Sequence, residues 1–187
     1  MNKAALFNTL LWTWTASEVL IIVLTRTRSG AGDVQDRGSL RILLPVIFVS
    51  VTLALQGPAP HNLFGGAPWL VTAGLVLFAI GLAVRWSAIA TLGRFFSSNV
   101  AIRPNQSVQR AGLYRFLRHP SYSGMLLIFA AIGLCTRNWG DLAIMLLPTT
   151  AALLYRIQVE EAALNQAFGQ DYSDYCKTTK RLIPGLY

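Results

Sequence analysis

Long apolar runs restrict the folds that this sequence can adopt. A helix needs about 20 mainly apolar residues to cross the roughly 30 Å hydrocarbon core of a bilayer, and fewer where the bilayer thins. Five segments qualify, at about residues 4–25, 40–56, 69–86, 121–136 and 141–157. The sequence therefore predicts an all-α integral membrane protein, a helical bundle with five transmembrane helices.

Composition agrees with a membrane protein and argues against a nucleic-acid partner. Hydrophobic residues make up 53% of the chain and charged residues only 13%, whereas about a quarter of the residues in soluble domains are charged. The net charge of +8 would favour nucleic-acid binding if the basic residues formed one stripe on a soluble domain. Here they gather at the ends of the spans, so we expect no nucleic-acid partner.

The positions of Lys and Arg predict the orientation, because positive charges near span ends resist translocation. With the N-terminus outside, only Lys3 and Arg137 of the sixteen basic residues lie outside. The C-terminus is then cytosolic, in a bacterial inner membrane or the endoplasmic reticulum. No small-residue cleavage site precedes Arg26, so we expect the first span to be retained. The bilayer is the expected partner, and no obligate protein partner is evident.

The chain divides into a three-span region over residues 1–92 and a second region over 93–187, which we expect to form one integrated domain. The Gly- and Pro-rich stretch 57–68 predicts a turn outside the hydrocarbon. Residues 85–120 contain six Arg and no acidic residue. This segment predicts the longest soluble connection, on the cytoplasmic side.

Two cysteines and one glutamate are the candidates for chemistry outside the main motifs. Cys135 lies in an apolar run and Cys176 in the polar tail, so neither a disulfide framework nor a metal site is expected. Glu18 is the only charge in the first span. Because a charge at membrane depth is costly, we expect Glu18 to pair with an Arg.

The fourth and fifth spans are separated only by residues 137–140, which predicts an antiparallel helical hairpin. The hairpin places the start of one span beside the end of the other, so His119 converges with Glu160. Arg156 and Glu160 are four residues apart and share a helical face. Each motif alone is compatible with a membrane anchor or a surface ion pair, but their convergence predicts a site.

The segments before and after the hairpin also have sequence patterns that predict local structure. Pro120 suits the first turn of a helix, and the free N–H groups of 121–124 then favour an anionic group. After the fifth span, apolar residues at helical spacing predict a short amphipathic tail with a break at Gly169. Tyr172 and Tyr175 are interpreted as packing residues of this tail, and Phe95 and Phe96 as interfacial residues.

An ordered set of motifs over residues 93–184 resembles the isoprenylcysteine carboxyl methyltransferase family. The motifs are Gly112-Leu113-Tyr114, Arg118-His119-Pro120-Ser121-Tyr122-Ser123-Gly124, Arg156 with Glu160-Glu161, Phe168-Gly169 with Tyr172 and Tyr175, and Arg181-Leu182-Ile183-Pro184. The resemblance implies a membrane-embedded methyltransferase that uses S-adenosylmethionine and takes a lipophilic or prenylated acceptor from the bilayer.

The resemblance also implies site residues. Those expected to bind the cofactor are Gln106, Val108, Gln109, Tyr114, His119, Pro120, Ser121, Tyr122 and Glu160. Substrate binding is assigned to Arg156, the expected catalytic residue, and to Glu161. The guanidinium of Arg156 suits a carboxylate because it donates two parallel hydrogen bonds.

Alternatives remain open from the sequence. Relatives with similar motifs methylate phospholipid amines, phenolic lipids or thiols, although Arg156 favours an acidic acceptor and hence an isoprenylcysteine-like carboxyl group. A second hypothesis is an NADPH-dependent membrane reductase that resembles the sterol reductases, which calls for further phosphate-binding Arg or Lys near the hairpin. A third is a non-enzymatic membrane adaptor whose motifs act only as anchors.

Overall fold

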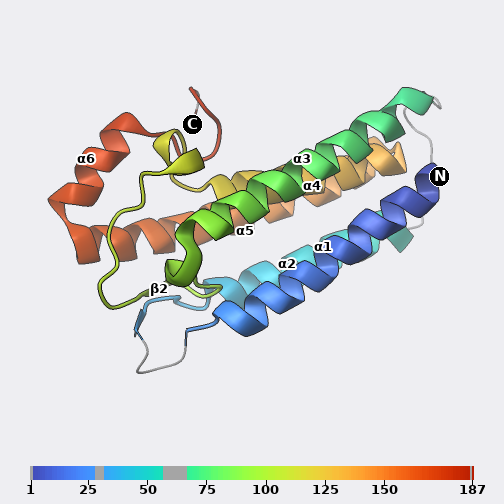
Figure 1. Cartoon of the computed structure of the whole chain (residues 1–187). Helices are drawn as coiled ribbons and strands as arrows, with labels where there is room; N and C mark the ends of the chain where they lie inside the picture. Colours follow the sequence, from blue (N-terminus) through green and yellow to red (C-terminus); the bar gives the residue numbers. More distant parts are fainter. Residues whose placement is uncertain (1, 28–31, 57–66, 186) are drawn as a thin grey trace.

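The computed structural model of the chain describes residues 2–27, 32–56, 67–185 and 187, which form a helical bundle (Figure 1). The elements are α1 (Lys3–Thr25), β1 (Asp33–Val34), α2 (Ser39–Gln56), α3 (Pro68–Leu92), the 3₁₀ helix η1 (Gly93–Phe95), β2 (Ala101–Ile102), the 3₁₀ helix η2 (Gly112–Arg115), α4 (Pro120–Thr136), α5 (Trp139–Phe168) and α6 (Gln170–Thr178). The predicted all-α membrane bundle is confirmed. The predicted turn falls mostly on residues 57–66, which lie outside the described residues.

Four of the described helices, α1, α2, α3 and α5, are long and apolar enough to cross a membrane. The predicted count of five spans is not confirmed, because α4 has only 17 residues. At about 1.5 Å per residue such a helix is about 26 Å long, less than the hydrocarbon core. Pro120 begins α4, and Arg137 ends it in the left-handed conformation with a φ of 55°.

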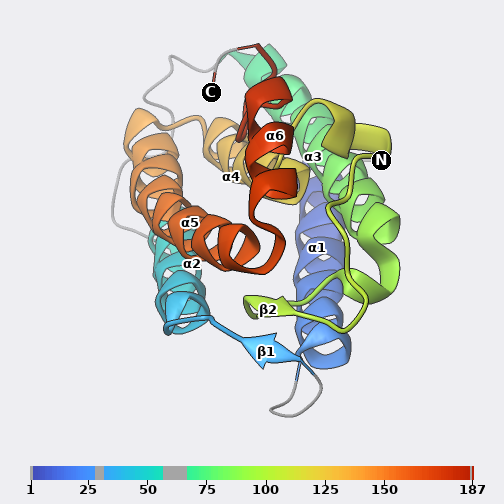
Figure 2. The same ribbon diagram turned by 90° about the vertical axis from the view of Figure 1, so that its left-hand side faces the viewer.

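In the view of Figure 1, α1 and α2 both lie below α3, α4 and α5. α3 and α4 lie side by side, α5 packs against both α4 and α2, and α1 packs against α3. β1 pairs with β2 in an antiparallel register that places Asp33 opposite Ile102. Figure 2 shows this short pair and α6 on the side of the bundle that faces the viewer. The end of the bundle opposite the N-terminus therefore collects the polar connections.

The hairpin of α4 and α5 is tighter than predicted, since only Arg137 and Asn138 lie between the two helices. Asn138 caps α5 by accepting a hydrogen bond from the Gly140 amide at 2.7 Å. α5 then continues without interruption to Phe168, well beyond the predicted end of its apolar part. The predicted break at Gly169 is confirmed, with a φ of 52° that glycine adopts without strain.

Glycines set the close approach of α3 and α4. A Cβ atom on Gly81 would lie 2.9 Å from the Gly124 carbonyl oxygen, and one on Gly124 would lie 2.7 Å from the Arg85 amide nitrogen. Small residues at such positions let helix backbones pack in a membrane, where the hydrophobic effect between helices is absent. The pairing of α3 with α4 therefore depends on these two positions.

The charge of Arg85 is buried in the bundle, so the prediction that Arg85 starts the cytoplasmic loop is wrong. α3 continues past Trp86 to Leu92, and Arg85 is 5% exposed. Its guanidinium forms an ion pair with Glu18 of α1 and donates a hydrogen bond of 2.8 Å to the Ser121 hydroxyl. The expected pairing of Glu18 with an Arg is thus confirmed, and desolvation gives the reason for it.

Asp36 attaches the connection between α1 and α2 to α5. Its carboxylate accepts hydrogen bonds from the Leu40 amide at 3.2 Å and the Ser39 hydroxyl at 2.9 Å, so it caps the start of α2. It also accepts one from Arg156 of α5 at 3.0 Å. Burial by itself would raise the pKa of Asp36. The hydrogen bonds from the Val100 and Leu40 amides and the Ser39 hydroxyl lower the pKa by a larger amount, so the net shift is downward.

We expect Gly81→Ala to lower the free energy of unfolding by about 1–3 kcal/mol, because the added methyl group overlaps the α4 backbone. Thermal unfolding of the protein in detergent measures the effect. Ala83→Val adds two methyl groups on an exposed face of α3 and serves as the control, since these have room in the surroundings of the helix. Equal melting temperatures for the two variants would contradict the close packing described above.

We expect Asp36→Asn to destabilise the protein by on the order of 2 kcal/mol at neutral pH, since it leaves Arg156 without its counter-ion. Because the folded pKa of Asp36 lies below the unfolded value of about 3.9, its stabilisation is complete above that pH and is lost as the pH falls through the folded pKa. The gap in melting temperature between wild type and variant should therefore close in acid. Asp33→Asn, at an exposed position, is the control.

Candidate functional site

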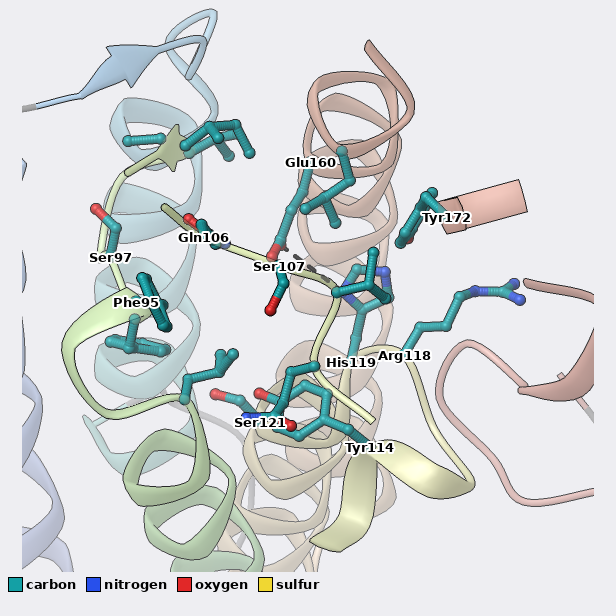
Figure 3. A pocket seen from close by; sticks show the side chains of 18 of the residues that line it. Phe95, Ser97, Gln106, Ser107, Tyr114, Arg118, His119, Ser121, Glu160 and Tyr172 are labelled. Atoms are coloured by element: carbon teal, nitrogen blue, oxygen red, sulfur yellow. Dashed lines mark ion pairs between the residues drawn. The ribbon is translucent and has the colours of Figure 1, made fainter. Parts of the chain in front are cut away.

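Two cavities meet near the polar end of the bundle. The first, here called the polar cavity, has an empty volume of about 850 Å³. Its walls come from the 92–109 stretch, the segment around the start of α4, the second half of α5 and α6 (Figure 3).

Most of the residues predicted to bind a cofactor line the polar cavity. These are Gln106, Val108, Gln109, Tyr114, His119, Ser121, Tyr122 and Glu160. Pro120 is not in the wall within the described structure and instead begins α4, where its missing N–H is no loss. The structure thus brings distant segments together at one cavity, and their role in binding a cofactor stays a prediction.

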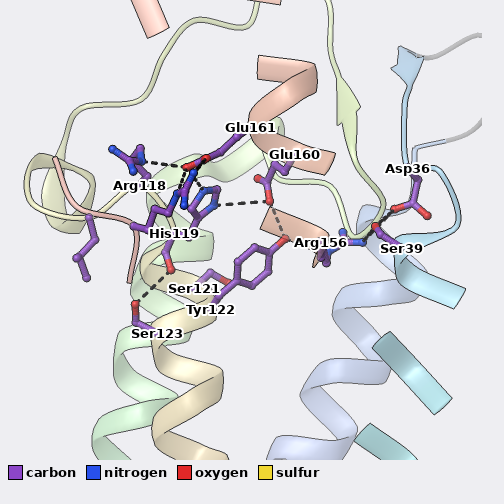
Figure 4. A network of polar contacts seen from close by, with 12 residues as sticks. Asp36, Ser39, Arg118, His119, Ser121, Tyr122, Ser123, Arg156, Glu160 and Glu161 are labelled. Atoms are coloured by element: carbon purple, nitrogen blue, oxygen red, sulfur yellow. Dashed lines mark hydrogen bonds and ion pairs between the residues drawn. The ribbon is translucent and has the colours of Figure 1, made fainter. Parts of the chain in front are cut away.

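A chain of polar contacts runs along the wall of the polar cavity from His119 to Arg156 (Figure 4). His119 Nδ1 lies 3.7 Å from Glu160 Oε2, and the same carboxylate oxygen accepts a hydrogen bond of 2.7 Å from the Tyr122 hydroxyl. That hydroxyl in turn accepts one of 2.9 Å from Arg156 Nε. The rings of His119 and Tyr122 stack with an interplanar angle of 14°. The predicted convergence of His119 with Glu160 is confirmed.

Arg156 is held rigidly in this network, with its side chain only 4% exposed. Besides Tyr122, it donates to Asp36 at 3.0 Å, to the Ser39 hydroxyl at 2.8 Å and to the Ser98 carbonyl at 2.6 Å. The sequence indicated a position on the same helical face as Glu160. It did not indicate that the N-terminal region supplies the counter-ion.

Glu161 has surroundings different from those of its neighbour Glu160. Its carboxylate accepts hydrogen bonds from Arg118 at 3.0 Å and from Arg181 at 2.8 Å, and it lies 3.4 Å from His119 Nε2. Among the described residues, the wall of the polar cavity includes Glu160 but not Glu161. The geometry therefore gives no support to the expectation that Glu161 binds substrate, since two guanidinium groups already occupy it.

The C-terminal segment pairs directly with the backbone around His119. The Arg118 amide donates to the Lys180 carbonyl at 2.7 Å and the His119 amide to the Arg181 carbonyl at 3.1 Å. The Ser123 hydroxyl donates to the Leu182 carbonyl at 2.6 Å. The Arg181-Leu182 motif of the sequence thus fixes the position of His119 at the cavity wall.

The second cavity, here called the apolar cavity, has an empty volume of about 1080 Å³ and lies between α1, α2 and the other helices. Its lining is mostly aliphatic and aromatic, with Ile22, Leu44 and Phe48 as examples. It shares four wall residues with the polar cavity: Phe96, Ser97, Tyr122 and Arg156. The two cavities are therefore neighbours, and Arg156 lies where they meet.

Some wall residues were not expected from the sequence. Tyr172, Tyr175, Phe95 and Phe96 all line the polar cavity, so their interpretation as packing or interfacial residues alone was incomplete. The two tyrosines belong to a motif of the sequence, and that motif was the available signal. The two phenylalanines had no signal, because their place in the wall depends on how the 93–109 segment folds back over α5.

Comparison with known proteins places this chain in a family. The model of the isoprenylcysteine carboxyl methyltransferase (ICMT) family matches residues 73–166, which include the start of α4, Arg156 and Glu160. The chain is similar to the protein-S-isoprenylcysteine O-methyltransferase A of Arabidopsis thaliana, with 30% identity over 62% of this chain and 60% of that protein.

Other relatives are similar over the same region. The protein-S-isoprenylcysteine O-methyltransferase of Schizosaccharomyces pombe is 30% identical over 60% of this chain and 49% of its own length. The enzyme of that name from Mus musculus is 29% identical over 62% of this chain and 42% of its own length. The chain thus spans about 60% or less of the length of these curated relatives. Because the family model covers half of the chain, including its hairpin site, this protein belongs to the isoprenylcysteine carboxyl methyltransferase family.

Proposed function

We propose that this protein is a membrane methyltransferase that transfers the methyl group of S-adenosylmethionine to the carboxylate of a lipophilic, isoprenylcysteine-like acceptor. The observation that carries the proposal is the contact between the two cavities at Arg156 and Tyr122. A polar ligand on one side and a lipid on the other would meet at that wall. The names of the relatives support the same chemistry, since each is an isoprenylcysteine O-methyltransferase.

The polar cavity has the chemistry that such a donor requires. The Glu160 side chain is 31% exposed, and its negative charge suits an ammonium or sulfonium group. The aromatic side chains of Tyr114 and Phe95 line the same cavity and suit a flat base. We assign donor binding to Glu160, His119, Ser121 and Tyr122, with Gln106, Val108 and Gln109 of the connection before η2, which line the same cavity.

The apolar cavity suits the acceptor, because its lipid-facing helices offer apolar side chains to a hydrocarbon chain. We assign the carboxylate end of the acceptor to Arg156, whose guanidinium is aimed by Asp36, Ser39 and Tyr122. When bound, S-adenosylmethionine would supply a methyl group on a positively charged sulfur: attack of the acceptor carboxylate oxygen on the methyl carbon would form the C–O bond as the C–S bond opposite breaks, with S-adenosylhomocysteine as the leaving group. Alignment and exclusion of water are what this reaction needs from the protein, since no basic or nucleophilic side chain takes part.

Glu161 then has a structural role that supports the site. It neutralises Arg118 and Arg181 and so holds the segment before α4 and the C-terminal segment on α5. The proposal also keeps the orientation expected from the sequence, with the polar cavity on the cytosolic side. A nicotinamide-dependent reductase is a weaker alternative, because among the described residues the wall of the polar cavity contains no Arg or Lys beyond Arg118 and Arg156 to bind the phosphates of such a cofactor.

The acceptor assay tests the proposal directly. We expect the purified protein in lipid nanodiscs to transfer a radiolabelled methyl group to N-acetyl-S-farnesylcysteine, and not to the same compound with its carboxyl group blocked as an amide. The product should be a base-labile ester, identified by mass. Phosphatidylethanolamine and a phenolic lipid serve as competing acceptors. Label in one of these, with none in the free acid, would overturn the carboxyl assignment.

We expect substitution of Glu160 to weaken cofactor binding and substitution of Glu161 to destabilise the fold. Glu160→Gln keeps the acceptor for Tyr122 but removes the charge, so we expect the affinity for S-adenosylhomocysteine to fall about 10-fold or more, with little change in melting temperature. Glu161→Gln breaks two ion pairs of a side chain that is only 12% exposed, so we expect it to lower the free energy of unfolding by on the order of 3 kcal/mol. Calorimetry and thermal unfolding in detergent distinguish the two. The reverse pattern would exchange their roles.

A further inference from the structure

One buried polar group on the wall of the polar cavity has no partner. Within the described part of the chain, three buried side-chain atoms lack a hydrogen bond: Trp14 Nε1, Asp141 Oδ2 and the Tyr172 hydroxyl oxygen. Of these, Tyr172 is the one that lines the polar cavity, where Figure 3 shows it near Glu160 and His119. The residue is 2% exposed. Folded proteins rarely leave a buried hydroxyl unpaired, because its desolvation is not compensated.

The neighbouring tyrosine shows that this hydroxyl is not needed to attach α6. The Tyr175 hydroxyl donates to the Tyr114 carbonyl at 2.8 Å and contacts the Leu117 carbonyl at 3.2 Å, so it holds α6 against η2. The two rings are tilted at 49° with centroids 6.0 Å apart. Tyr172 therefore contributes its ring to the same packing, while its hydroxyl stays available to a ligand.

The charges around Tyr172 define the kind of group that it can bind. Burial raises the pKa of Tyr172 and the Glu161 carboxylate raises it further, so the phenol keeps its proton and offers an O–H donor. Arg118 also lines the polar cavity and shares the carboxylate of Glu161 with Arg181. A phenolic O–H and a guanidinium on the same wall suit an anionic group of the ligand, whereas the Glu160 carboxylate suits a cationic one.

We propose that the Tyr172 hydroxyl binds the amino-acid end of the methyl donor, donating a hydrogen bond to its carboxylate beside Glu160. This inference rests on the proposed function. A methionine-type group presents an ammonium and a carboxylate on the same carbon, and Glu160 and Tyr172 offer the complementary pair on one stretch of cavity wall. Tyr172 thereby becomes a donor-binding residue in addition to its packing role in α6.

The test compares Tyr172→Phe with Tyr175→Phe, the same chemical change one turn apart on the same helix. Two probes are titrated by calorimetry in detergent: S-adenosylhomocysteine, and 5′-methylthioadenosine, which lacks the amino-acid end. We expect Tyr172→Phe to bind S-adenosylhomocysteine about 3- to 10-fold more weakly, the effect of one lost hydrogen bond. Its affinity for 5′-methylthioadenosine should match that of the wild type.

Thermal unfolding without ligand gives an independent readout. Tyr172→Phe should unfold at the wild-type temperature or above, because it removes an unpaired buried hydroxyl, whereas Tyr175→Phe should unfold earlier because two carbonyls lose their donor. Unchanged binding of S-adenosylhomocysteine by Tyr172→Phe, or equal weakening of both probes, would overturn this inference alone. A wild-type protein that binds neither probe would overturn the proposed function with it.

Discussion

The buried guanidinium of Arg156 ties together the regions that make up the site. Taking a guanidinium out of water costs several kcal/mol unless its charge and its N–H groups find partners. Here the four partners come from three places in the chain: Asp36 and Ser39 at the start of α2, Ser98 in the long connection, and Tyr122 in α4. Because the side chain needs all of them, the N-terminal helices, the 93–109 segment and the hairpin are held in one arrangement. That arrangement is what places the two cavities side by side.

The same principle recurs at two more carboxylates, Glu18 and Glu161, whose ion pairs join segments far apart in the sequence. Glu18 of α1 neutralises Arg85 of α3, and Arg85 also reaches Ser121 at the wall of the polar cavity. Glu161 of α5 neutralises Arg118 and Arg181 and so attaches the C-terminal segment. Removing one member of such a pair leaves a buried charge, so these contacts specify the geometry more than they add net stability.

Close helix packing and the polar network support each other. Gly81 and Gly124 bring α3 and α4 together, and this approach carries Arg85 against the start of α4. The short hairpin link then sets α5 beside α4, with Tyr122 between Glu160 and Arg156. A site that transfers a group between a polar ligand and a lipid needs this rigidity, because misplacement of the two reactants by about an ångström is costly in rate.

The sequence by itself determined the membrane-embedded helical fold, the hairpin, the break at Gly169 and the approach of His119 to Glu160. These follow from apolar run lengths, a very short link and helix-breaking residues, which act locally. Only the tertiary structure decided that Glu160 faces the cavity while Glu161 faces Arg118 and Arg181, because successive helix residues point about 100° apart and the neighbours on each side come from distant segments. The burial of Arg85, the counter-ion of Arg156 and the unpaired hydroxyl of Tyr172 were decided in the same way, since desolvation is set by packing between segments and leaves no local pattern.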